Sequence, residues 1–298
     1  MKTTPVNLAR SAPRLVVLAS MVISIPAWGQ DLVDSDWLSK HLADRNLVVL
    51  HVGEADGYAK AHIPGSRNLA LADVTKGADF SAKGLLFELP SAAELRSKFE
   101  SLGVSDNARI ILYAGTEQPL PAVTRVALVL NHIGLGAHTS LLNGGLRAWT
   151  KIGQTTTAEV PSFSPGRITP TPDKADIVDA DFVKSIPNKP GYKLIDARAA
   201  ANYKGIEPSF GKAGHIPGAI SIPFNEMNDD VQQFNRDRIG LAFQAAGVKP
   251  DDKLVVYCHV GMQATEVIFG ARLLGYDPVL YDGSFQDWTI NNRGPVEK

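Results

Sequence analysis

The feature that most constrains the fold of this chain is an internal repeat. Four short segments occur twice in the same order, at separations between 139 residues (Asn143 to Asp282) and 153 residues (Ala61 to Gly214). The four pairs are 47–51 and 193–196, 61–65 and 214–218, 108–114 and 252–258, and 143–149 and 282–288. One short match could arise by chance, but four matches in order indicate duplication. The chain is therefore expected to contain two related domains.

Length and composition agree with two domains. The 298 residues, 44% of them hydrophobic, are enough for two separate cores. Between the repeats, residues 155–172 (TTTAEVPSFSPGRITPTP) are rich in Thr, Ser and Pro and have no helical period, as expected of an extended linker. We therefore divide the chain into a first domain at 31–152, a linker at 153–172 and a second domain at 173–298.

The local patterns predict an α/β fold in both halves. Apolar runs such as Leu254–Tyr257 do not alternate with polar residues, which is typical of a parallel strand covered on both faces. Helical spacing is seen at 177–183 with Asp179 as its cap, at 235–246, and at 265–274, where it stops before Gly275. We expect two mainly parallel sheets, each with helices on both faces.

The first 29 residues have the three parts of an export signal. Three positive charges lie in residues 1–14, an 11-residue apolar run follows at 15–25, and small residues at Ala27 and Gly29 precede the expected cleavage site. The run is short for a bilayer span, although an uncleaved anchor is the alternative. We expect a periplasmic mature protein of net charge −1 − 3 = −4, with no membrane partner. The sequence shows no basic face, so a nucleic-acid partner is not expected.

Cys258 is the only cysteine. A lone thiol in an exported protein cannot form an internal disulfide, so it is either an inert core residue or a nucleophile. Its neighbours favour the nucleophile, because it follows an apolar strand and precedes a helix that starts near Ala264. Backbone N–H groups of such a turn converge on an anion, and Gly261 allows the turn its backbone angles. On this basis we expect a low pKa for Cys258 and a thiolate near neutral pH.

The segment Cys258–Ala264 resembles the active loop of the rhodanese family, Cys-x-x-Gly-x-x-Ala/Ser. His215–Ala219 is similar to the family's upstream motif, and Leu194–Arg198 resembles the second domain of tandem thiosulfate and 3-mercaptopyruvate sulfurtransferases. The resemblance covers nearly all of the chain after residue 29. It implies an enzyme in which Cys258 takes sulfane sulfur from thiosulfate or 3-mercaptopyruvate, becomes a persulfide, and passes the sulfur to cyanide, a small thiol or a protein thiol.

The same resemblance assigns the site residues. Cys258 is the expected catalytic residue, and no metal or organic cofactor is implied. The expected substrate-binding residues are Arg198, His259, Val260, Gly261, Met262, Gln263 and Ala264. Ala114 replaces the cysteine in the first domain, which is therefore expected to be inactive, although it could still form one wall of the site.

The chain departs from close relatives in having little positive charge near the cysteine. His259 and Val260 follow it directly, and Asn202 stands where relatives often have a second arginine. Partial protonation of His259 is one expected source of charge. Arg198 either binds the donor or only pairs with Asp196.

Two alternatives to sulfur transfer differ in what they require of the cysteine loop. A phosphatase of related fold needs an arginine six residues after its cysteine, and Ala264 is at that position. A persulfide carrier or regulatory module with little turnover is the non-enzymatic alternative.

His62 in the first half and His215 in the second occupy matched positions, and so do Trp149 and Trp288. All four are expected to be structural.

Overall fold

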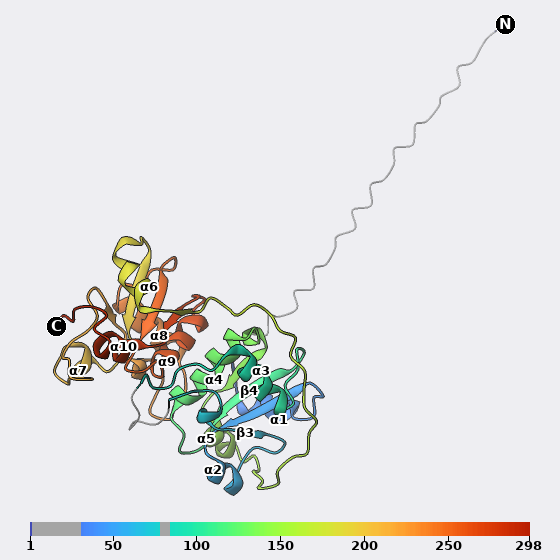
Figure 1. Ribbon diagram of the computed structural model, residues 1–298. Helices are drawn as coiled ribbons and strands as arrows, with labels where there is room; N and C mark the ends of the chain where they lie inside the picture. Colours follow the sequence, from blue (N-terminus) through green and yellow to red (C-terminus); the bar gives the residue numbers. More distant parts are fainter. Residues whose placement is uncertain (2–30, 78–83) are drawn as a thin grey trace.

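The computed structural model describes Met1, residues 31–77 and residues 84–298 (Figure 1). Apart from Met1, the predicted export signal lies outside the described residues. Within them, no helix is long and apolar enough to cross a bilayer.

Each half contains one parallel sheet that, within the described residues, has five strands. In the first half these are β1 (Asp31–Val33), β2 (Leu47–Val52), β3 (Arg67–Leu69), β4 (Arg109–Ala114) and β5 (Thr139–Leu142). In the second half they are β6 (Ile177–Val178), β7 (Tyr192–Asp196), β8 (Ile220–Ser221), β9 (Lys253–Tyr257) and β10 (Val279–Tyr281). The orders β1-β5-β4-β2-β3 and β6-β10-β9-β7-β8 are the same topology used twice, which confirms the duplication expected from the sequence.

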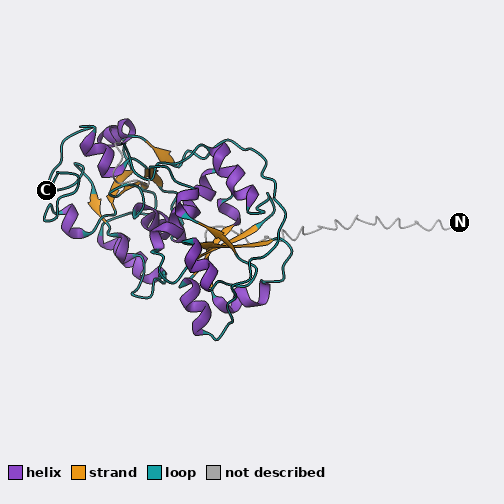
Figure 2. Cartoon of the chain, turned by 60° about the horizontal axis from the view of Figure 1, so that its bottom comes forward, coloured by secondary structure: helices purple, strands orange, loops and turns teal. Residues whose placement is uncertain are grey.

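Helices cover both faces of each sheet (Figure 2). The first half has α1 (Ser35–His41), α2 (Ala55–Lys60), α3 (Ala92–Ser101), α4 (Leu120–His132) and α5 (Gly145–Lys151), with 3-10 turns η1 (Leu71–Asp73) and η2 (Gly136–His138). The second has α6 (Ala180–Ser185), α7 (Ala200–Tyr203), α8 (Arg236–Ala245), α9 (Ala264–Leu273) and α10 (Ser284–Ile290), with η3 (Ile186–Asn188) and η4 (Phe224–Glu226). The predicted α/β class is thus confirmed.

The Asp179 cap predicted from the sequence is confirmed, but Ile177 and Val178, which lie in the predicted helical stretch, form strand β6. The Asp179 carboxylate accepts the Phe182 N–H at 2.8 Å, so α6 begins at Ala180. Asn235 caps α8 in the same way. These short polar side chains satisfy N–H groups that the first helical turn leaves without partners.

The two halves share a continuous apolar core through α4 and α9, which pack against each other (Figure 1). The Thr124 and Thr265 hydroxyls are 2.7 Å apart at this contact. Because the helices that follow the central strands β4 and β9 meet here, the carboxyl ends of both central strands lie close to the domain interface.

The segment between the halves is attached to the first half rather than free. The Gly166 N–H donates to the Glu100 carbonyl at 2.8 Å, and the Ile168 N–H donates to the Glu100 carboxylate at 2.7 Å. Thr169 donates its N–H and hydroxyl to Asp106, and Ile168 is buried. These bonds fix the path of a segment that has little regular structure of its own.

Candidate active site

Cys258 lies at the carboxyl end of β9, the central strand of the second sheet, and its side chain is fully buried. Residues 259–263 form the turn that leads into α9. The Cys258 N–H donates to the Ser284 hydroxyl at 3.2 Å, and the Cys258 carbonyl accepts the Phe285 N–H at 3.0 Å. The backbone of Cys258 is therefore fixed by the start of α10.

The turn forms a cradle of amides around the thiol. The backbone N–H groups of Val260, Gly261 and Ala264 hydrogen-bond to Cys258. Gly261 has a φ of +76°, and a Cβ there would lie 2.9 Å from the Asp282 carbonyl oxygen. Glycine is therefore required both by the backbone angle and by the close contact. The loop therefore directs backbone N–H groups at the thiol, as the predicted anion cradle requires.

The expectation of a thiolate at neutral pH is wrong for the sulfur-free protein. Burial raises the pKa of the Cys258 thiol above its ordinary value, and the amides of Ala264, Val260 and Gly261 offset only part of that rise. The carboxylate of Asp196 raises the pKa further. The sequence shows the amides of the loop but not the depth of burial, and desolvation is the larger effect here.

The sequence left two roles for Arg198, donor binding and pairing with Asp196. In the structure Arg198 forms the salt bridge with Asp196. Its Nη2 lies 2.6 Å from Asp196 Oδ2 and its Nε 3.0 Å from Oδ1, and both side chains are fully buried. Nη2 also donates to the Gly214 carbonyl at 2.7 Å, and the Tyr257 hydroxyl donates to Asp196 at 2.7 Å. Arg198 Nη1 is buried and has no hydrogen-bond partner among the described residues, so one donor of the guanidinium is available.

The remaining loop residues supply little charge. Burial, followed by the charge of Arg198, lowers the pKa of His259 to about 4. The expected partial protonation of His259 at neutral pH is therefore wrong. Val260, Met262 and Gln263 are half-buried, and Gln263 Oε1 has no partner within the described part of the chain. Asn202 is directed elsewhere, because its Nδ2 donates to the Glu207 carbonyl at 3.1 Å.

The equivalent position in the first half lacks the chemical groups. The register pairs His51 with Tyr113 as it pairs Asp196 with Tyr257, so His51 replaces Asp196, Gly53 replaces Arg198 and Ala114 replaces Cys258. No thiol, acidic residue or guanidinium is left at these three positions. The first half thus retains the strand and turn without the groups for sulfur chemistry.

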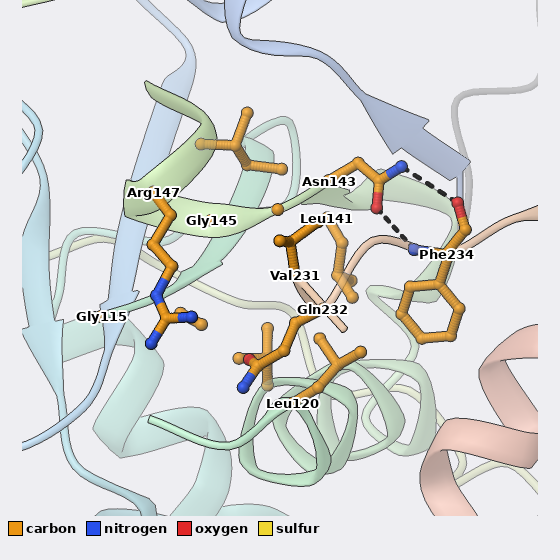
Figure 3. Close-up of a pocket in the computed structure, with 13 residues that line it drawn as sticks. Gly115, Leu120, Leu141, Asn143, Gly145, Arg147, Val231, Gln232 and Phe234 are labelled. Carbon is orange, nitrogen blue, oxygen red and sulfur yellow. Dashed lines mark hydrogen bonds between the residues drawn. The ribbon is translucent and has the colours of Figure 1, made fainter. Parts of the chain in front are cut away.

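A segment of the second half, residues 231–234, covers this position. Figure 3 shows Asn143 bonded to the backbone of Phe234, with its Nδ2 donating at 3.1 Å and its Oδ1 accepting at 2.8 Å. Val231, Gln232 and Phe234 line the small cavity beside Ala114.

In turn, the first half contributes to the wall around Cys258. Gln286 accepts the Leu86 N–H at 2.9 Å and donates to the Gly84 carbonyl at 3.3 Å. Arg125 of α4 donates to the Gly261 carbonyl at 3.3 Å and to Asp282 Oδ1 at 2.7 Å. Sequence reasoning missed Arg125. The available signal was a single positive charge in an apolar helix, since Leu120–His132 is otherwise almost uncharged.

The paired histidines and tryptophans are structural, as predicted. His62 stacks on Tyr58 with ring centroids 3.7 Å apart, and His215 stacks on Tyr203 at 3.8 Å. The indole N–H of Trp149 donates to the Thr155 carbonyl at 2.8 Å, and Trp288 makes the same bond to Pro295. Equal contacts in both halves indicate packing roles. No cluster of metal-ligating side chains occurs in the described ranges.

Comparison with known proteins agrees with this geometry. The model of the rhodanese-like domain matches the chain twice, at residues 34–152 and 179–291. A probable 3-mercaptopyruvate sulfurtransferase from Pseudomonas aeruginosa is 33% identical over 89% of this chain and 97% of its own length. A thiosulfate sulfurtransferase from the same organism is 28% identical over 89% and 96%.

A solved structure shows the same two-domain arrangement. The crystal structure of SseA from Escherichia coli, a 3-mercaptopyruvate sulfotransferase, covers 87% of this chain and 99% of its own, with a TM-score of 0.74 and 24% identity. The duplicated sheets, the cysteine loop and the two matches of the domain model lead to one assignment: the chain belongs to the rhodanese-like family.

Proposed function

We propose that the protein is a sulfurtransferase that carries sulfane sulfur as a persulfide on Cys258. The single observation that carries this proposal is the cradle of three amides around a cysteine at the end of a central strand. The relatives by sequence are named as sulfurtransferases for 3-mercaptopyruvate and for thiosulfate. The names of these relatives support an enzyme rather than a carrier with little turnover.

The proposed reaction takes place at the Cys258 sulfur, beside the backbone amides of the loop. The Cys258 thiol gives its proton to solvent, and the thiolate attacks the sulfur atom that the donor transfers. With thiosulfate the S–S bond breaks and sulfite leaves with the electron pair. With 3-mercaptopyruvate the C–S bond breaks, and the enolate that leaves takes a proton from solvent to become pyruvate. The product is a Cys258 persulfide, whose negative charge the amides of Val260, Gly261 and Ala264 stabilise as an oxyanion hole would. A thiophilic acceptor then removes the outer sulfur and regenerates the cysteine.

The donor-binding groups are proposed to be the loop 259–264 and Arg198. The free Nη1 of Arg198 supports this role, because a buried unpaired donor favours an acceptor such as a donor anion. The low positive charge near Cys258 supports a donor bound mainly by hydrogen bonds. The acceptor is proposed to be cyanide or a thiol, with a protein thiol as a second possibility.

The test uses purified protein and a Cys258→Ser variant. Each is exposed to thiosulfate or to 3-mercaptopyruvate, and its intact mass is measured before cyanide or a thiol is added. We expect wild-type protein to gain one sulfur atom and to turn over, and the serine variant to do neither. Turnover in the serine variant would exclude Cys258 as the carrier. A persulfide that forms and is not discharged by any thiol or cyanide would favour the carrier function.

Export to the periplasm is proposed from the sequence of residues 1–29 alone. The mature protein should begin at Gln30. Sequencing the N-terminus of protein taken from the cell envelope of the native host tests this, and retention of Met1 there would contradict cleavage.

A further inference from the structure

The second half of the chain holds Cys258, but a fully buried arginine of the first half contacts the cysteine loop. Arg125 is 0% exposed and belongs to α4. It donates from Nη1 to Asp282 Oδ1 and to the Gly261 carbonyl, and from Nη2 to the Phe87 carbonyl at 2.6 Å. One guanidinium therefore joins the cysteine loop, the start of the α10 turn and a first-half segment.

Gly261 is the point where this contact meets the chemistry. Its N–H is one of the three that hydrogen-bond to Cys258, while its carbonyl accepts from Arg125. The left-handed backbone at Gly261 lets its N–H face the thiol while its carbonyl faces the domain interface. A guanidinium with fixed donors restricts the orientation of that residue, because its planar fork is rigid.

Comparison of the two halves shows that the contact is not a general packing requirement. Arg125 follows Thr124 in α4. Its equivalent in α9 is Glu266, which follows Thr265, the residue whose hydroxyl lies 2.7 Å from that of Thr124. Glu266 accepts a hydrogen bond from Asn228 Nδ2 at 2.7 Å. Asn143 occupies the position of Asp282 and holds the Phe234 backbone without an arginine. The interface is thus built without a charge pair on the side of the inactive Ala114 turn, and with one on the side of Cys258.

From this geometry we infer that Arg125 is a positioning residue for sulfur transfer, through which the inactive half sets the cysteine amide cradle. The inference rests on the proposed role of Cys258 as the sulfur carrier. Arg125 does not touch the sulfur. It holds the Gly261 peptide and the Asp282 carboxylate, so that the Gly261 N–H stays directed at Cys258. The duplicated half then has a role in the reaction although it has no nucleophile.

The test compares Arg125→Met, which removes the donors and keeps a long side chain, with Arg125→Lys, which keeps one charged donor. Arg236→Met is the matched control, because it removes another ion pair between the halves, Arg236 with Asp31 at 2.6 Å, away from the loop. For each protein, kcat and KM for thiosulfate are measured, with the pH dependence of iodoacetamide alkylation of Cys258.

We expect Arg125→Met to lower kcat about tenfold and to raise the apparent pKa of Cys258 by about one unit, since one amide of the cradle is misdirected. Arg125→Lys should recover part of both losses, and Arg236→Met should match wild type. A folded Arg125→Met protein with wild-type kcat and alkylation profile would overturn the inference.

A second variant keeps the test valid if Arg125→Met does not fold. Arg125→Met combined with Asp282→Asn removes both charges together, and asparagine already serves at the equivalent Asn143. It should show the same loss of kcat and the same pKa shift, and a wild-type profile would again overturn the inference. If wild-type protein transfers no sulfur, the proposed function fails instead, whereas the alkylation profile still reports on the cradle.

Discussion

The pair of Asp196 and Arg198 offers the sharpest test of how the donor is held. Both side chains are fully buried, and Asp196 also accepts from the Tyr257 hydroxyl. Arg198→Met alone would leave a buried carboxylate without its cation, at a loss of about 3–5 kcal/mol in the free energy of unfolding. Any rise in KM in that variant could therefore come from a disturbed fold, so the single variant does not isolate donor binding.

The double variant Asp196→Asn/Arg198→Met separates the two effects. An asparagine oxygen still accepts from Tyr257, and no buried charge is left unpaired, so most of the stability should return. The free Nη1 of Arg198 is still lost. If it binds the donor anion, one charge-assisted bond of about 1.5–3 kcal/mol disappears, and KM for thiosulfate should rise tenfold or more.

The assay measures thiosulfate kinetics with cyanide, thermal unfolding, and the rate of alkylation by iodoacetamide. The neutral reagent controls for an intact thiol and should react at a similar rate in the double variant once compared at equal thiolate fraction. An unchanged KM in a stable double variant would refute the reasoning. It would mean that the loop amides hold the donor alone and that Arg198 serves only Asp196.

Three further substitutions test other parts of the second half. Burial raises the pKa of Glu266 to about 8, so its contribution to stability is present below its unfolded value of 4.5 and is lost as pH rises toward 8. In Glu266→Gln the free energy of unfolding should depend less on pH across that range, by at most about 5 kcal/mol in total. Denaturant titrations at several pH values measure this, and the same dependence of the unfolding free energy on pH as in wild type would contradict it. His259→Asn should leave the pH profile of kcat/KM between pH 5.5 and 8 unaltered, because burial keeps the His259 pKa near 4. Gly261→Ala should lower kcat more than it raises KM, since a Cβ would meet Asp282 at 2.9 Å, and a wild-type kcat would show that the loop tolerates the change.

The two copies of the domain contact each other's turns. Segments of each half lie against the turn of the other: residues 84–89 contact Gln286 and Asp282, and residues 231–234 contact Asn143. Neither half encloses its own turn alone. The inactive copy is therefore part of the surroundings of Cys258 rather than a passive appendage.

Several features followed from the sequence by itself. The repeat required two similar sheets, because strand, turn and helix signals in one order give one topology. The unpaired Cys258 before a glycine turn identified the thiol and its amide cradle, since both are consequences of local backbone geometry. The presence of a histidine at the matched positions 62 and 215 indicates packing, because a catalytic histidine would have no use in the copy with Ala114.

Other features were decided by the tertiary structure alone. The pKa of Cys258 is set by how deeply the sulfur is buried, and the low pKa of His259 by its burial and the nearby Arg198. The contact of Arg125 with Gly261 joins residues 136 positions apart along the chain. Local sequence determines backbone direction and the order of elements, because these depend on neighbouring residues. Desolvation and long-range contacts depend on which surfaces the two halves bury against each other, and no local pattern specifies that.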